Sequence, residues 1–174
     1  MTTSHAASTQ SARAKSLKAL WRIIEPKVPA SRDLRMFSEG HIHIHGHGAS
    51  FNSEQALRIL KRGISSKVIS PLSEYLMVGK GDLVLILDLD RTTALRRAGK
   101  DQPLPMHSAE SVLRLIELKE LANDTFETED VALGWLRRPH PMLDGETPLE
   151  SAKTSFGSKR VKDILVAIKH GGVV

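Results

Sequence analysis

The segment 147–150, Thr-Pro-Leu-Glu, marks the start of a helix more firmly than any other part of this chain. A threonine N-cap accepts a bond from the third helical amide, and a glutamate there bonds back to the threonine amide. Proline suits the first helical position because its φ is already helical. A second helix follows, with apolar residues at i, i+3, i+4 and i+7: Val161, Ile164, Leu165 and Ile168.

Helix signals also dominate from residue 52 onward. Asn52 or Ser53 can cap a helix that ends at Gly63. Its expected inward residues are Ala56, Leu57 and Leu60. The next helix begins at Ser65 or Ser66, and Pro71 must either kink it or mark a later start. Its expected buried residues are Val68, Ile69, Leu72, Tyr75 and Leu76.

Two more helices complete the pattern. A long helix over 108–123 carries an apolar stripe that Lys119 interrupts, and this helix is our candidate for a dimer interface. The stripe consists of Val112, Leu115, Ile116, Leu118, Leu121 and Ala122. Thr128 caps the following helix, in which we expect Trp135 to lie in the core.

The composition agrees with a mainly α fold. Aromatic residues make up 4% of the chain and cysteine is absent, so the core must consist of aliphatic side chains without disulfides. The absence of cysteine is typical of a reducing cytoplasm. No apolar run approaches the roughly 20 residues of a membrane span. We therefore expect a cytoplasmic protein that has no membrane contact.

We expect residues 1–50 to form a variable basic N-terminal arm. The formal net charge of +5 is concentrated in residues 1–35, which suits contact with an anionic polymer but equally describes a solvated tail. Residues 1–12 lack side chains to bury, so we expect them to be disordered. In the stretch 41–47 four histidines alternate with isoleucines or glycine, which predicts a short strand with histidines on one face. A metal-binding protein is one hypothesis, but a polar strand or loop explains the pattern better, and we predict no metal site.

No catalytic signature is present. The chain lacks a nucleophile elbow, a Walker A loop, a dinucleotide fingerprint and an H-E-x-x-H motif. Asp88 and Asp90 lie close together, but helix capping accounts for Asp90 without catalysis. We therefore predict a protein that is not an enzyme and has no cofactor.

The stretch 80–100 is a candidate DNA-binding helix-turn-helix. Residues 83–87 could form a buried strand or a buried helix, since an unbroken apolar run fits both. In a helix-turn-helix, 82–87 would be the supporting helix, 88–89 the turn and 91–98 the recognition helix. A solvated basic helix is the alternative. The candidate DNA-binding residues are Arg91, Thr92, Thr93, Arg96, Arg97 and Lys100.

The segment 132–150, ALGWLRRPHPMLDGETPLE, resembles the signature of the Xre/MbcA/ParS antitoxin family. The shared pattern is a "WL" helix end, a proline-containing loop, a glycine and a "TPL" helix start. Phe156-Gly157 and a last helix that closes near Gly171 fit the end of the pattern. The resemblance is strong over 128–172 and looser over 80–126, and it does not extend before about residue 50.

The resemblance implies an Xre-type helix-turn-helix core over 51–126 and a C-terminal toxin-binding domain over 127–174. It implies a type II antitoxin that neutralises a RES-domain toxin, an enzyme that consumes NAD or ADP-ribosylates a target. It also implies operator DNA as a partner, repression of the protein's own operon, and a homodimer within a larger complex. The alternative is a stand-alone transcription regulator whose C-terminal domain only dimerises.

The implied toxin contacts are the outer cations of the last helices and a tail over the toxin's NAD cleft. A tail that follows a rigid helix can enter a cleft at small entropic cost, although a frayed terminus is the simpler alternative. The candidate toxin-binding residues are Lys153, Arg160, Lys169, His170, Gly171, Gly172, Val173 and Val174. Lys159 and Lys162 are expected on the same outer faces.

Overall fold

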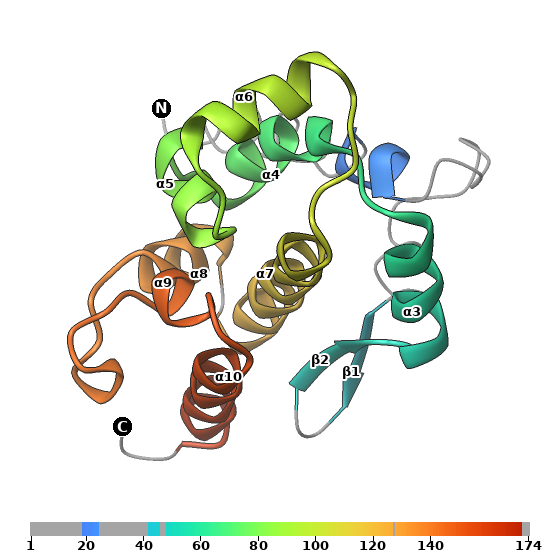
Figure 1. The fold of residues 1–174 in the computed structure, drawn as a ribbon. Helices are drawn as coiled ribbons and strands as arrows, with labels where there is room; N and C mark the ends of the chain where they lie inside the picture. Colours follow the sequence, from blue (N-terminus) through green and yellow to red (C-terminus); the bar gives the residue numbers. More distant parts are fainter. Residues whose placement is uncertain (1–18, 25–41, 46–47, 127, 172–174) are drawn as a thin grey trace, which may run out of the picture.

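The computed structural model describes residues 19–24, 42–45, 48–126 and 128–171, and these residues are mainly helical, as predicted (Figure 1). Residues 19–24 are helical and bury Leu20, Trp21 and Ile24. The antiparallel hairpin β1 (Ile42–His45) and β2 (Gly48–Phe51) follows. The strand expected near residue 41 is thus confirmed over 42–45. The disorder expected for residues 1–12 concerns residues outside the described ranges.

Helices make up the rest of the described chain. Their order is α3 (Ser53–Arg62), η1 (Ser66–Val68), α4 (Ile69–Leu76), α5 (Lys80–Ile86), α6 (Arg91–Gly99), α7 (Met106–Thr125), α8 (Glu129–Leu136), η2 (Pro141–Leu143), α9 (Pro148–Ser151) and α10 (Ser155–Lys169). None of the helices in the described ranges is long and apolar enough to cross a bilayer.

Helix α7 is the central element of the fold (Figure 1). Helices α8 and α10 pack on one side of it, α3 and the hairpin lie on the other, and α4 to α6 gather at one end. The apolar stripe of α7 is buried by these neighbours. The expectation that helix 108–123 offers a dimer interface is therefore wrong for this stripe, because the chain itself covers it.

Helix α3 begins where the sequence predicted but faces a different way. Asn52 accepts a bond from the Glu54 amide, and Gly63 closes the helix with a φ of 84°. Ile59 is fully buried, whereas the Leu57 side chain is 53% exposed. Ala56 and Leu60 only pack partly against the core. The prediction for Leu57 was wrong because it lies two residues, about 200° of helical rotation, from the buried Ile59.

Pro71 does not kink a helix, because the helix that contains it begins later than Ser65 or Ser66. Ser65 caps the short 3₁₀ turn η1, and α4 then begins at Ile69, so Pro71 lies in the first turn of α4. A proline there removes no helical hydrogen bond. All five residues predicted to be buried in this helix are buried.

The ambiguous run 83–87 is helical. In α5 and the residue after it, Leu83, Val84, Ile86 and Leu87 are buried while Leu85 is exposed. Consecutive apolar residues fit a helix here because α4 and α6 both pack against it. The supporting helix of the predicted pair therefore exists, and it starts two residues earlier than expected.

The C-terminal caps are confirmed. Thr147 and Glu150 form the reciprocal capping box at the start of α9, with Pro148 at the first position. Thr128 caps α8 by accepting from the Val131 amide. Val161, Ile164 and Leu165 are buried, and Ile168 packs partly against the core.

Candidate functional site

Helices α5 and α6 are joined by a short turn. Leu87 and Leu89 donate backbone bonds to the carbonyls of Leu83 and Val84, which closes α5. Asp88 takes a left-handed φ of 55°, a conformation that Asn and Asp tolerate better than other non-glycine residues. Leu89 is buried beneath the turn. Two helices are thus held against each other by a connection of four residues.

Asp90 fixes the start of α6. Its carboxylate accepts a bond of 2.8 Å from the Thr93 amide. The hydrogen bond from the Thr93 side chain, followed by the Thr93 amide, holds the pKa of Asp90 below its ordinary value. The Thr93 hydroxyl is therefore engaged in capping the helix.

The structure divides the six predicted DNA-binding residues into two groups. Arg91, Thr92, Arg96 and Lys100 are exposed along α6 and the residue that follows it. Thr93 and Arg97 are half-buried. The Arg97 guanidinium donates to the Pro103 carbonyl at 2.9 Å, so this arginine holds the loop that follows α6.

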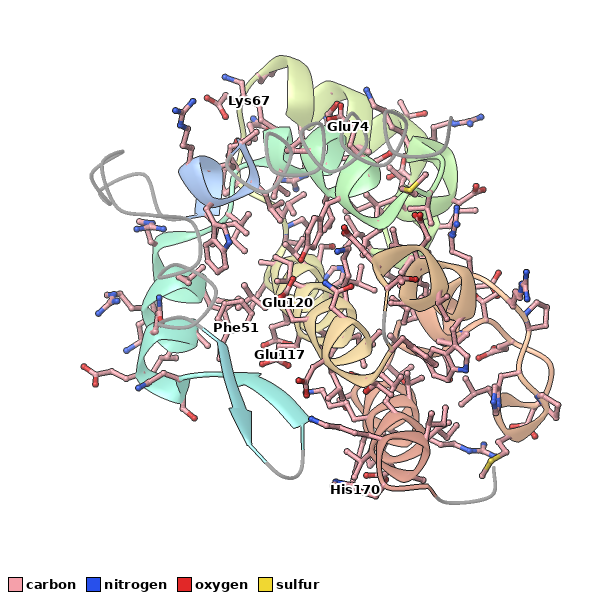
Figure 2. The ribbon with its side chains drawn as sticks, turned by 180° about the vertical axis from the view of Figure 1, so that it is seen from behind. Phe51, Lys67, Glu74, Glu117, Glu120 and His170 are labelled. Carbon is pink, nitrogen blue, oxygen red and sulfur yellow. The ribbon has the colours of Figure 1, made fainter. Side chains whose placement is uncertain are left out.

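A second set of contacts anchors the end of α6. The backbone at 64–66 pairs with 102–104, through Ser66 N to Gln102 O and Leu104 N to Ile64 O. Asp101 accepts from the Lys67 ammonium and the Ser65 hydroxyl. Lys67 first and Ser65 second lower the pKa of Asp101. Figure 2 shows Lys67 at this end of the molecule.

The C-terminal region presents a second candidate surface. A loop between α8 and α9 contains η2 and closes through His140 N to Glu146 O at 3.0 Å. Asp144 and Gly145 both take positive φ there. Arg160 on α10 reaches back to Asp144 at 3.0 Å, so the loop is tied to the last helix.

Each predicted toxin-binding cation has an acidic partner within the chain. Lys153 lies 3.4 Å from Asp88, and Arg160 is paired with Asp144. Lys169 contacts Asp124 on α7 at 2.5 Å. All three side chains remain partly exposed.

The other residues predicted for the toxin-binding surface are not all on the outer face. His170 and Gly171 are exposed at the end of α10, and Gly172, Val173 and Val174 lie outside the described residues. Lys159 is exposed and pairs with Asp163. Lys162 does not lie on the outer face, because it bonds to the largely buried Glu117 of α7 at 2.8 Å.

Phe156 is the surface residue that the sequence analysis missed. Its side chain is 86% exposed in the first turn of α10. Arg160 follows it at i+4, on the same face of the helix. The sequence did contain an indication that Phe156 is exposed, because this residue falls outside the apolar i, i+3, i+4, i+7 pattern that begins at Val161.

Two polar networks connect α7 to the elements packed around it. Lys119 is 1% exposed, bonds to Glu129 of α8 at 2.5 Å and lies 4.0 Å from the ring centroid of Tyr75 in α4. Tyr75 donates to Glu120, and burial first and then Glu120 raise the pKa of the phenol well above its ordinary value.

Glu117 forms the second network (Figure 2). It accepts from the Phe51 amide at 2.6 Å and from Lys162 of α10. One carboxylate thus joins strand β2 to the last helix across α7.

Comparison with known proteins relates the C-terminal region to toxin-binding domains of antitoxins. Residues 121–171 match the family described as the antitoxin Xre/MbcA/ParS C-terminal toxin-binding domain. The chain is 26% identical over 122 residues to the Prs ADP-ribosylating antitoxin of Sphingobium sp. (strain YBL2), which covers 65% of this chain and 77% of that protein. It is 25% identical over 114 residues to the antitoxin Xre of Photorhabdus laumondii, with the same coverage. An antitoxin Xre of Pseudomonas putida is 28% identical over 79 residues, covering 45% of this chain and half of that protein.

These similarities support an antitoxin role for this chain, with a toxin as its partner. Residues 121–171 match the toxin-binding domain of the Xre/MbcA/ParS antitoxins, as the sequence motif predicted, and the chain is similar to proteins named antitoxin Xre. The family match begins at residue 121, inside α7. The antitoxin assignment disfavours the stand-alone regulator.

Proposed function

We propose that this antitoxin neutralises a RES-domain toxin with the surface formed by α10 and the η2 loop. The observation that carries the proposal is Phe156, which is almost fully exposed within the matched toxin-binding region. Aromatic residues, including Phe, and arginines are enriched at protein interfaces relative to the rest of the protein surface. Phe156 and Arg160 supply both on one helical face.

The C-terminal tail extends this surface. His170 and Gly171 directly follow a helix of 15 residues that is packed against α7. A tail with an ordered base loses little conformational freedom when it enters a cleft. The proposed role of residues 169–174 is to occupy the NAD-binding cleft of the toxin.

DNA binding is the second part of the proposal. Arg91, Thr92, Arg96 and Lys100 give α6 an exposed basic face that could contact operator phosphates and bases. Figures 1 and 2 place α6 and the end of α10 at opposite ends of the molecule. The tail at the end of α10 could therefore contact a toxin while α6 contacts the operator. Repression would use a homodimer on two half-sites.

Co-expression with the toxin encoded beside this gene tests the toxin proposal, with growth and cellular NAD as readouts. The full chain should restore both, whereas Phe156→Ala or removal of residues 169–174 should reduce the rescue. Leu57→Ala is the matched control, because Leu57 is an exposed apolar residue outside the matched domain. Full rescue by both altered chains would overturn the proposed surface, and a toxin that leaves NAD unchanged would overturn the proposed toxin class.

A further inference from the structure

A cavity of about 390 Å³ lies between η1, α4, α5 and α6, away from the toxin-binding region. This volume falls within the range of small-molecule sites, roughly 300–1,000 Å³. Its apolar walls come from one residue of each of the helices α4, α5 and α6. These residues are Ile69, Val84 and Ala94.

The charged residues that line the cavity are all cationic. Lys67, Lys80 and Arg91 line it, and no acidic residue does. Lys67 is already paired with Asp101. Lys80 and Arg91 have no carboxylate partner among the described residues. Two uncompensated cations therefore face one partly apolar space.

Arg91 is held over α5 by a close approach. A Cβ atom at Gly81 would lie 2.7 Å from the Arg91 Nη2 atom, so the guanidinium rests on the bare backbone of Gly81. Gly81 also lines the cavity. A planar guanidinium in this position can bind an oxyanion through two parallel hydrogen bonds.

A buried hydroxyl completes the site. Ser66 is fully buried and lines the cavity, and its Oγ has no hydrogen-bond partner among the described residues. Buried polar atoms in folded proteins nearly always have a partner, so an orphaned one beside a cavity needs an explanation. A polar atom of a bound ligand supplies it.

We propose that this cavity binds a small organic anion, an apolar body that carries a phosphate or carboxylate group. Arg91 and Lys80 bind the oxyanion, Ser66 bonds to a polar atom of the ligand, and Ile69, Val84 and Ala94 cover the apolar body. A DNA phosphate fits this site less well, because a backbone phosphate brings no apolar group to fill a hollow between helices.

Binding of four probes to the full chain, measured by calorimetry, tests the proposal. Naphthyl phosphate and naphthoate carry both parts of the ligand, naphthalenemethanol lacks the charge, and inorganic phosphate lacks the apolar body. At least one of the first two should bind saturably, and at least tenfold more tightly than the last two. The tighter of the two identifies the oxyanion. Equal affinity for inorganic phosphate would overturn the proposal.

Variants locate the binding. Arg91→Gln should weaken the tighter probe about tenfold, and Ala94→Leu should abolish binding by filling the cavity. Arg62→Gln, on the exposed end of α3, is the matched control and should change nothing. Ser66→Ala, a smaller change, keeps the test valid if Ala94→Leu does not fold, and it should weaken binding.

Probe affinity that survives Arg91→Gln and Ser66→Ala would overturn the proposal. So would a chain that binds duplex DNA but none of the probes. Any effect of the ligand on DNA binding rests on the proposed function of α6, because Arg91 is its first residue. Calorimetry without DNA measures ligand binding independently of that function.

Discussion

At the scale of single residues, two neighbours in the family motif have different roles. Phe156 is exposed, whereas Gly157 lies where α10 meets the end of α9. A Cβ atom at Gly157 would lie 1.9 Å from the Ser151 carbonyl oxygen, so the helices meet there at backbone distance. Phe156 is thus available for contact with a partner, whereas Gly157 allows α9 and α10 to pack closely.

Gly157→Ala should lower the free energy of unfolding by about 2 kcal/mol, because either helix α9 or helix α10 must shift. Gly134→Ala is the control, since Gly134 lies within α8 and a Cβ there has open space. Alanine in a helix interior should stabilise the protein by about 0.5 kcal/mol. Urea denaturation of both variants measures the difference, and equal midpoints would contradict this account of Gly157.

The capping box should make stability depend on pH. Bonds from the Thr147 hydroxyl first and the Thr147 amide second lower the pKa of Glu150 below its ordinary value of 4.5. A carboxylate whose pKa is lowered by folding stabilises the protein above its unfolded pKa, and this stabilisation is lost as the pH falls through the folded pKa.

Glu150→Gln should therefore lower the free energy of unfolding at pH 7 by about 0.5 kcal/mol, a small value because the group is largely exposed. The difference should shrink as the pH falls through the lowered pKa of the wild-type carboxyl and protonates it. In a Thr147→Val background the same substitution should have a smaller effect, since its hydroxyl partner is gone. A difference that persists at low pH would argue against the charged cap.

At the scale of elements, the sequence was informative about where helices begin and end. Asn52, Thr128 and Thr147 all cap helices as predicted, because capping depends on residues within one turn. The orientation of a helix depends on its neighbours, so the inward placement of Leu57 failed and the run 83–87 stayed ambiguous.

Partners across the fold could not be predicted. The sequence marked Lys119 as out of place in an apolar stripe, but its bond to Glu129 and its contact with Tyr75 require the packed helices. Similarly, six residues of 91–100 looked equivalent for DNA binding, whereas Arg97 bonds to Pro103. The motif over 132–150 did identify the toxin-binding family, since family motifs preserve local signals.

Helix α6 gives a testable prediction for DNA binding. Arg96→Gln should weaken binding to the DNA upstream of this gene, and it should reduce the slope of log affinity against log salt by about 0.9 if one phosphate contact is lost. Arg62→Gln, exposed on α3, should leave both quantities unchanged. Mobility shifts at several salt concentrations provide the measurement. An unchanged slope would remove Arg96 from the DNA interface.

At the scale of the whole molecule, α7 joins the proposed domains 51–126 and 127–174 into one folded unit. A single hydrophobic cluster extends from Leu20 and Ile24 to Ile164 and Leu165. The Lys119 and Glu117 networks cross the proposed boundary. Folding of the toxin-binding region should therefore depend on the rest of the chain.

The two tryptophans can test this dependence, because Trp21 lies before the proposed boundary at 126–127 and Trp135 lies after it. Trp21 packs edge to face against Phe51, with ring centroids 5.9 Å apart, and Trp135 packs against Phe126 at 5.8 Å. Trp135→Phe leaves Trp21 as the reporter of the N-terminal end, and Trp21→Phe leaves Trp135 as the reporter of the toxin-binding end.

In each variant, urea unfolding followed by fluorescence should have the same midpoint as unfolding followed by circular dichroism. Agreement between a local and a global probe is the signature of one cooperative transition. If the Trp135 signal instead changed at a separate midpoint from the helical signal, the C-terminal region would unfold on its own. The boundary at 126–127 would then separate two independent domains, and α7 would not couple toxin binding to the helices that are proposed to bind DNA.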